Sequence, residues 1–286
     1  MDTMSAKAPD TIPETMHWAL MGELYSLYES PLTPCGQDVA AFQRVISCWQ
    51  SAYGRQHLRI LQCGVTPALA SMAWPDGAEL LAVDKTEGAI RALWPRPPGR
   101  RWALCANWLQ LPQADASCDV AAGDGSFNCM QYPQEYLALA ASLHRILRPG
   151  GLLLMRCFIR PEPPETPEQV FAGLRAGQCA SFHEFKWRLV MALQPDITRG
   201  VLVGDVFRAW ARARVSTARL SRQTGWDPKV IDTIRIYEGK HTLLSFPTLA
   251  ELQAVLRGTF DQVSIETPQY PLGERCPTVA FIRRQG

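Results

Sequence analysis

The chain has 286 residues and a formal net charge of +2, and 47% of its residues are hydrophobic. This apolar content is enough for a full buried core, which excludes a disordered or fibrous protein. Acidic and basic residues are interspersed, so the whole molecule has no strong attraction to nucleic acid or to a membrane surface. We therefore expect neither as a partner.

The cysteines and the N-terminus indicate the compartment. Nine cysteines are present and none are spaced as C-x-x-C, which is typical of free thiols in a reducing environment. Residues 1–15 are polar, lack the order of a signal peptide and predict a disordered tail. No apolar run reaches the roughly eighteen residues that span a bilayer. We therefore expect a cytoplasmic protein. We also expect no metal site, because the sequence has neither the spacing of zinc ligands nor a set of aspartates suited to magnesium.

In chain order, the first predicted elements are helices. Apolar residues at helical spacing predict one helix over 16–30 and another over 36–53, and we assign residues 16–55 to a lid or substrate-binding region. Five short apolar runs follow, separated by helix signals at 86–94 and 133–147. Such runs are typical of parallel strands covered on both faces, so the sequence predicts a doubly wound, Rossmann-like α/β fold. The predicted strands are 58–63, 79–84, 102–106, 118–123 and 151–158.

The pattern changes after residue 160, where four prolines within eight residues indicate a stiff linker. Further helices follow, two of them opened by capping boxes at Thr166–Gln169 and Thr248–Glu251. The predicted elements are helices 167–177, 181–193, 203–222 and 248–257 and strands 263–266 and 278–283. We therefore predict a sheet domain of residues 56–160 and 246–286, capped by a helical insertion of residues 161–245.

Two motifs in the sheet domain indicate a nucleoside site. A strand ends in a turn at Gly64, and Asp84 ends the next strand twenty residues later. An acid at that distance from a glycine turn can accept hydrogen bonds from both ribose hydroxyls. A helix that ends in Arg148-Pro149-Gly150-Gly151 and leads directly into a strand favours S-adenosylmethionine over a nicotinamide.

As an ordered series, these segments resemble the class I S-adenosylmethionine-dependent methyltransferases, of the type 11-like small-molecule group. The resemblance covers residues 56–158 and 246–283. It implies a seven-stranded sheet with a C-terminal antiparallel hairpin, and S-adenosylmethionine as the cofactor. It also implies that Asp84 binds the ribose, that Asn107 receives the adenine amino group and that Asp124 pairs with the cofactor's ammonium. The cofactor-binding residues it implies are Gln62, Gly64, Asp84, Lys85, Asn107, Trp108, Gly123 and Asp124.

The glycine loop departs from the family pattern. It reads Gln62-Cys63-Gly64-Val65-Thr66-Pro67-Ala68, without the leading acid and the two later glycines, and so is stiffer and bulkier. Structural roles also stay open, in which Asp84 caps a helix and Trp108 packs in the core. No catalytic residue is identified, because methyl transfer depends on alignment more than on acid–base help. The weak candidates for a base are His183, Glu184, Tyr237, Glu238 and His241.

We expect a methyltransferase acting on an oxygen or nitrogen of a small organic molecule. A first alternative is a non-catalytic protein that acts through a protein partner, with Val65 and Thr66 occupying the methionine site. A second is an NAD-dependent oxidoreductase, which the missing G-x-G-x-x-G disfavours. A stripe of arginines on the helix predicted over 203–222 could bind phosphate or an anionic substrate, but such a stripe is more typical of a solvated helix face. The stripe consists of Arg208, Arg212, Arg219 and Arg222.

Overall fold

The computed structural model describes residues 22 and 24–284. The predicted tail, 1–15, and most of the helix predicted over 16–30 lie outside these residues. Gly22 is helical as predicted, but over 24–30 the prediction is wrong. A short 3-10 helix, η1 (Tyr25–Leu27), is followed there by turns. Pro31 disfavours helical geometry only in Ser30, the last residue of the predicted helix.

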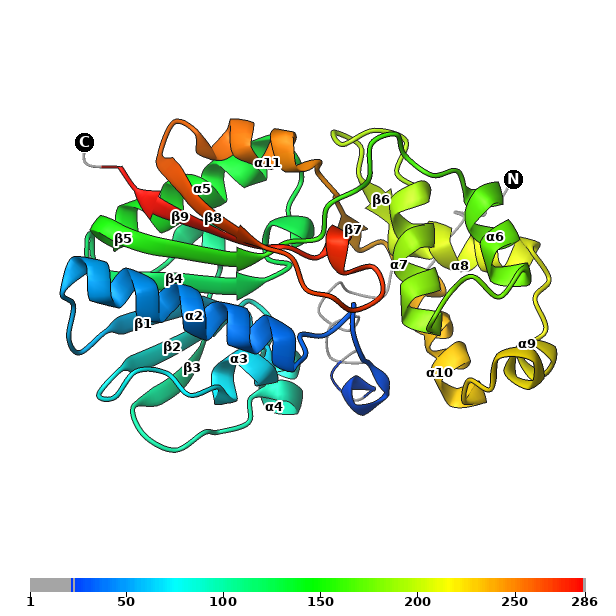
Figure 1. Ribbon diagram of the computed structural model, residues 1–286, viewed down its shortest axis with the longest axis horizontal. Coiled ribbons are helices and arrows are strands. Elements are labelled where there is room, and N and C mark those ends of the chain that lie inside the picture. Colours follow the sequence, from blue (N-terminus) through cyan, green and yellow to red (C-terminus); the bar gives the residue numbers. More distant parts are fainter. Residues whose placement is uncertain (1–21, 23, 285–286) are drawn as a thin grey trace, which may run out of the picture.

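The core of the described residues is a seven-stranded sheet in the order β3-β2-β1-β4-β5-β9-β8 (Figure 1). Strands β1 to β5 are parallel, and β9 runs antiparallel to both β5 and β8. The predicted α/β fold and its C-terminal antiparallel hairpin are therefore confirmed. The strands are β1 (Arg59–Cys63), β2 (Glu79–Asp84), β3 (Arg101–Cys105), β4 (Cys118–Asp124), β5 (Leu147–Arg156), β8 (Phe260–Glu266) and β9 (Thr278–Arg283).

Helices cover both faces of this sheet because the central strands are apolar on both. On one face α2 (Gly36–Tyr53) buries Phe42 and Trp49 against Ile60, beside the short helix α3 (Pro67–Ser71). On the other, α5 (Gln134–Ile146) and α11 (Leu249–Leu256) bury Leu143 and Leu252. Helix α4 (Glu87–Leu93) packs beside β2 and β3. Among the described residues, none of the helices is long and apolar enough to cross a membrane.

The segment after β5 forms a separate group of helices with its own apolar core, towards which the parallel strands point (Figure 1). The predicted helical cap is present in the fold. Its elements are α6 (Pro167–Arg175), α7 (Phe182–Ala192), α8 (Val203–Arg212), α9 (Thr217–Thr224), α10 (Pro228–Asp232), the 3-10 helix η4 (Thr233–Tyr237) and a two-stranded sheet of β6 (Val201–Leu202) and β7 (Leu243–Leu244).

The single helix predicted over 203–222 is wrong. The chain leaves the helix after Arg212, Arg214 takes a left-handed φ of 48°, and Ser216 caps the new helix α9 by accepting from the backbone of Arg219. Serine favours this capping position because its hydroxyl satisfies a free N–H group. The four arginines thus belong to two helices, and the single-helix stripe that could bind phosphate does not form.

Candidate functional site

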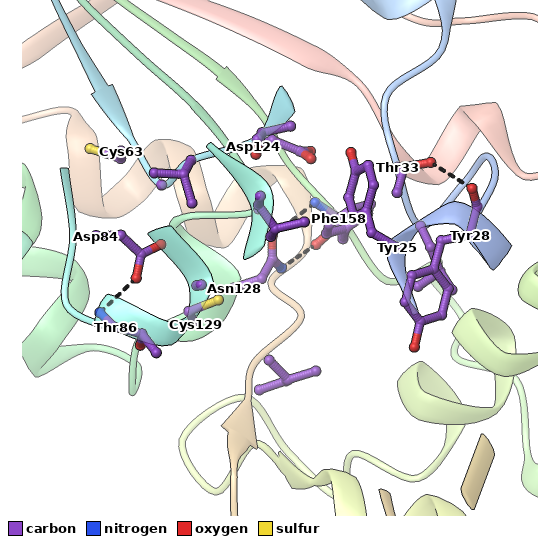
Figure 2. A pocket seen from close by; sticks show the side chains of 18 of the residues that line it. Tyr25, Tyr28, Thr33, Cys63, Asp84, Thr86, Asp124, Asn128, Cys129 and Phe158 are labelled. Carbon is purple, nitrogen blue, oxygen red and sulfur yellow. Dashed lines mark hydrogen bonds between the residues drawn. The ribbon is translucent and has the colours of Figure 1, made fainter. Parts of the chain in front are cut away.

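A pocket lies at the carboxyl ends of the parallel strands, between the sheet and the cap. Figure 2 shows Asp84 on one side of it and Tyr25 and Tyr28 on the other. Such a position is usual for ligand sites of open α/β sheets. Most of its walls are apolar or aromatic. They include Tyr25, Tyr28, Gly64, Val65, Asp84, Lys85, Trp108, Asp124, Gly125, Asn128, Phe158, Trp187 and Tyr237.

The loop after β1 forms one wall. Gly64 has a φ of 91°, a conformation that favours glycine, and its N–H donates to the carbonyl of Val83. The Gln62 amide donates to the carbonyls of Gly64 and Thr66 at 3.1 and 3.2 Å. Gln62 is buried and is not among the pocket-lining residues; it holds the loop in shape. Val65 is buried against Ala82 and Ala89.

Asp84 stands at the end of β2 and lines the pocket. Its Oδ1 accepts from the backbone N–H of Thr86 at 2.9 Å, just before α4 (Figure 2). Burial raises the pKa of this carboxyl, and bonds from Thr86 and the nearby Lys85 oppose that rise. Asp84 therefore both accepts a bond at the start of a helix and lines the pocket. Lys85 lines the pocket next to it.

Asn107 and Trp108, which follow β3, face two different hollows. Trp108 lines the pocket, and its indole N–H donates to the carbonyl of Val83 at 2.5 Å. The ring lies over Gly64, with Cζ2 3.7 Å from where a Cβ on that glycine would be. The side chain of Asn107 instead accepts from the N–H of Leu109 and faces a neighbouring hollow. That hollow shares Lys85 and Trp108 with the main pocket.

Asp124, at the end of β4, lines the pocket but is already paired. The buried guanidinium of Arg156 lies 2.6 Å from its Oδ1 and also binds Asp38 and the hydroxyl of Tyr270. Burial raises the pKa of Asp124 even though Arg156 lowers it. Two carboxylates and one guanidinium leave this cluster with one net negative charge when all are ionised. Gly123 lies in the sheet outside the pocket wall, where a Cβ would meet Ser126 and Met155.

Three pocket residues escaped the sequence analysis. Gly125 has a φ of 62°, and a Cβ there would lie 2.7 Å from the ring of Phe158. Asn128 donates to the carbonyl of Phe158 at 2.7 Å and accepts from its N–H at 3.0 Å (Figure 2). The one signal in the sequence is Asp124-Gly125-Ser126, which predicts a turn. It does not indicate whether that turn lines a pocket.

The candidate bases are scattered. Tyr237 is buried and lines the pocket, and burial raises its phenol pKa far above the usual range. His183 lies behind the wall, with Nε2 2.8 Å from the carbonyl of Leu27. Glu184 accepts from the N–H of Ala180. The two remaining candidates are Glu238, which is exposed, and His241, which faces the neighbouring hollow.

The residue that the sequence analysis missed most completely is Lys186 on α7. It is fully buried, and its ammonium donates to the hydroxyl of Thr233 at 2.9 Å. It also faces the rings of Tyr28 and Tyr237, at 4.9 and 5.5 Å from their centroids. Burial lowers its pKa to about 7. A lysine within an apolar run gives no sequence signal, because its environment arises from distant segments.

Together, the sheet order and the pocket at the strand ends define an open α/β protein of the Rossmann-like type. Residues 61–155 match the model of a family described as "Methyltransferase domain". A search of the curated proteins gives no match. Within the described residues, no group of three His, Cys, Asp or Glu side chains could hold a metal ion.

Solved structures share the fold at low sequence identity. A Rhodobacter sphaeroides protein described as a Zn-dependent alcohol dehydrogenase is 13% identical, with a TM-score of 0.58, covering 98% of this chain and 100% of its own. A chain from the complex of the Haloferax volcanii Trm112 methyltransferase activator with a methyltransferase is 10% identical, with a TM-score of 0.51. The match covers 96% of this chain and 99% of that one. Burkholderia thailandensis 1,6-didemethyltoxoflavin-N1-methyltransferase is 17% identical, with a TM-score of 0.48 (99% of both).

The segment 61–155 thus belongs to the methyltransferase domain family, and the resemblance to class I S-adenosylmethionine-dependent methyltransferases is confirmed. S-adenosylmethionine is the cofactor of that class. The solved structures, all below 25% identity, add the fold alone.

Proposed function

We propose that this protein transfers a methyl group from S-adenosylmethionine to an oxygen or nitrogen of a small organic molecule. The observation that carries the proposal is that Gly64 and Asp84 line one pocket with the aromatic side chains of the cap. A cofactor half and an acceptor half therefore meet in one space, as a direct transfer between two bound molecules requires.

The residues of the sheet side fit this cofactor. Asp84 supplies a carboxylate for a ribose diol, and each such charge-assisted bond contributes about 1.5–3 kcal/mol. Gly64 has no side chain, and a Cβ there would be in ordinary contact with Trp108 at 3.7 Å, so a ligand could approach the backbone beside that ring. The cluster of Asp38, Asp124 and Arg156 would carry one net negative charge with both carboxylates ionised, and that charge would suit a cationic group. When bound, the cofactor would supply an activated methyl group on a sulfonium.

The cap side would align the acceptor and exclude water. Phe158 and Trp187 pack edge to face at 5.0 Å, and both line the pocket with Tyr237. Such walls remove water from around the acceptor, which strengthens the electrostatic interactions inside. We assign these aromatic side chains to acceptor binding, and we propose the segment 161–245 as the substrate cap.

The first test is calorimetric titration of the purified protein with S-adenosylhomocysteine. We expect micromolar binding, and a loss of at least about tenfold in affinity in Asp84→Asn, because one charge-assisted bond is worth about that factor. Asp76→Asn is the matched control, since Asp76 is an exposed acid in the turn before β2. NAD serves as the competing ligand. No binding of S-adenosylhomocysteine, or tight binding of NAD, would refute the proposal.

One observation favours the non-catalytic alternative. The indole of Trp108 lies over Gly64 and is fixed by its bond to Val83, so it fills part of the space at the end of β1. If this ring closes the cofactor site, the protein would act through a protein partner. Val65 and Thr66, which that alternative assigned to the methionine site, both line the pocket, and Val65 is also buried against Ala82 and Ala89.

A further inference from the structure

Lys186 has an unusual set of neighbours for a buried cation. In the described part of the chain its partners are the neutral hydroxyl of Thr233 and the faces of three aromatic rings. Burial lowers its pKa, and no ion pair among the described residues joins Lys186 to a carboxylate. A buried charge without a counter-ion is costly, and such charges are usually paired.

The rings that face Lys186 belong to the pocket. Tyr28 and Tyr237 both line it, and Tyr28 lies on the side away from Asp84 (Figure 2). The next residue on α7, Trp187, lines it as well. The ammonium of Lys186 therefore lies behind the aromatic wall of the acceptor half and is positively charged when protonated. Asp124, which also lines the pocket, is paired with Arg156.

Two donors in this wall have no partner among the described residues. The hydroxyl of Tyr28 and the indole N–H of Trp187 are both buried and form no hydrogen bond there. The two side chains are 92% and 94% buried. A donor left unsatisfied in this way is unfavourable by about 1–3 kcal/mol. An oxygen atom of a bound molecule would satisfy such a donor and would also be attracted by Lys186.

We propose that the acceptor is a flat molecule with an acidic hydroxyl group, a phenol or an enol, bound as its oxyanion between the aromatic walls, and that Lys186 is the positioning residue that stabilises the negative charge. This inference rests on the proposed function. The aromatic walls favour a planar ring through stacking and edge contacts. The buried cation disfavours a protonated amine in the same place.

The proposal accounts for methyl transfer without a general base. The hydroxyl proton leaves to water as the acceptor binds, and the oxyanion then forms the new C–O bond. The C–S bond breaks at the same time and its electron pair stays on sulfur, which becomes a neutral thioether. The role of Lys186 is to make the first step favourable by lowering the pKa of the bound hydroxyl.

Among the described residues, the other titratable side chains that interact with Lys186 are neutral near pH 7. Burial raises the pKa of Tyr28 and Tyr237 well above their usual range. Burial, with Lys186 itself, lowers the pKa of His183 on the preceding turn to about 4. Lys186 is therefore the charge that an acceptor oxygen would meet here. An anion in the pocket would in turn favour the protonated lysine, since opposite charges stabilise each other.

The test uses 4-nitrophenol, whose anion absorbs visible light, with protein saturated with S-adenosylhomocysteine so that no turnover occurs. The pH is varied, and the anion band of the bound probe is recorded. We expect the pKa of bound 4-nitrophenol to lie at least about one unit below that of the free probe, which is a tenfold preference for the anion. In Lys186→Met this shift should vanish, while binding of the neutral analogue 4-nitrotoluene changes less than about twofold.

Two further variants keep the test decisive. Lys229→Met removes an exposed lysine from the same cap and should leave the shift intact. Tyr28→Phe keeps the ring but removes the hydroxyl, and should reduce the shift in part. Circular dichroism checks that each variant folds, and Lys186→Met is expected to fold because an apolar side chain of similar size often replaces a buried charge without loss.

The outcomes separate the two proposals. If S-adenosylhomocysteine binds but 4-nitrophenol does not, or ionises as in free solution, the acceptor inference is overturned and the methyltransferase proposal stands. Retention of the shift in Lys186→Met also overturns it. If S-adenosylhomocysteine fails to bind while the Lys186-dependent shift persists, the anion site is supported and the methyltransferase proposal fails.

Discussion

Trp108 decides how the end of the pocket near Gly64 is used. Its indole is fixed by the bond to the Val83 carbonyl and lies over Gly64. An aromatic face at the edge of a nucleoside pocket contributes about 0.5–1.5 kcal/mol by stacking. Trp108→Ala is therefore expected to weaken S-adenosylhomocysteine binding up to about tenfold by calorimetry. Tighter binding by the variant would contradict this and show that the indole fills the cofactor site. Trp102→Ala, on the exposed side of β3, is the matched control.

Lys186 also affects stability. Its pKa falls from an ordinary 10.5 to about 7 in the folded protein because of burial. Between these values the unfolded chain holds a proton that the folded chain has lost, so the free energy of unfolding rises with pH. Above pH 7, the free energy of unfolding of the unmodified protein should therefore rise relative to that of Lys186→Met by up to about 1.4 kcal/mol per pH unit.

Urea denaturation between pH 7 and 8.5 measures this gain. Thiols of the unfolded chain titrate near the upper end of this range, and the comparison with Lys186→Met removes their contribution because both proteins share it. The variant should be the more stable protein at pH 7, since it buries no charge. Parallel pH curves for the two proteins would exclude the effect. Lys229→Met, which alters an exposed lysine, should follow the unmodified curve.

The site was predictable only where spacing along the chain fixes geometry. Gly64 and Asp84 end neighbouring parallel strands, so their twenty-residue separation brings them to one edge of the sheet. Asn107 follows the third strand and faces the neighbouring hollow, because its side chain caps the turn at Leu109. Lys186 was not predictable, since Thr233 and Tyr28, which surround it, come from distant segments. The roles of all these residues in binding remain predictions.

Strands were easier to predict than the helices of the cap. The parallel strands in the middle of the sheet are largely buried on both faces, which requires a continuous apolar run, and β1, β2 and β4 begin and end within one residue of the predicted bounds. In the cap, helical periodicity continues from α8 into α9 although the chain turns between them. The break at Arg214 depends on a backbone conformation that the apolar pattern does not encode.

Arg156 shows how one side chain joins elements at the pocket. It ends β5 and reaches Asp38 on α2, Asp124 on β4 and the hydroxyl of Tyr270 before β9. Asp38 also accepts from the N–H of Cys35 and so caps α2. A fully hydrogen-bonded buried network of this kind has few alternative arrangements. The sheet end of the pocket is therefore held rigidly, and a ligand there meets Asp124 in a fixed position.

The arrangement of cap and sheet depends on contacts between them as well as on the linker. Glu165, in the linker after β5, binds Arg188 on α7 at 2.5 Å and Arg275 before β9 at 2.6 Å. One carboxylate thus joins the cap to the sheet domain. Burial raises the pKa of Glu165, but the two guanidinium groups outweigh it and the net pKa is lowered. A lowered pKa means that the ionised form stabilises the fold at neutral pH.

Glu165→Gln tests whether this bridge holds the two halves together. The variant keeps the size of the side chain but loses the charge, so we expect the free energy of unfolding to fall by roughly 1–3 kcal/mol at pH 7. The loss should shrink as the pH is lowered through the folded pKa of Glu165, because its carboxylate is then protonated in the unmodified protein too. Glu274→Gln is the matched control: Glu274 also pairs with Arg275 but is 67% exposed, where an ion pair contributes little. Urea denaturation at pH 7 and pH 4 measures both variants. Equal losses in the two would mean that Glu165 acts as an ordinary surface charge, and that the aromatic contacts across the pocket alone position the cap.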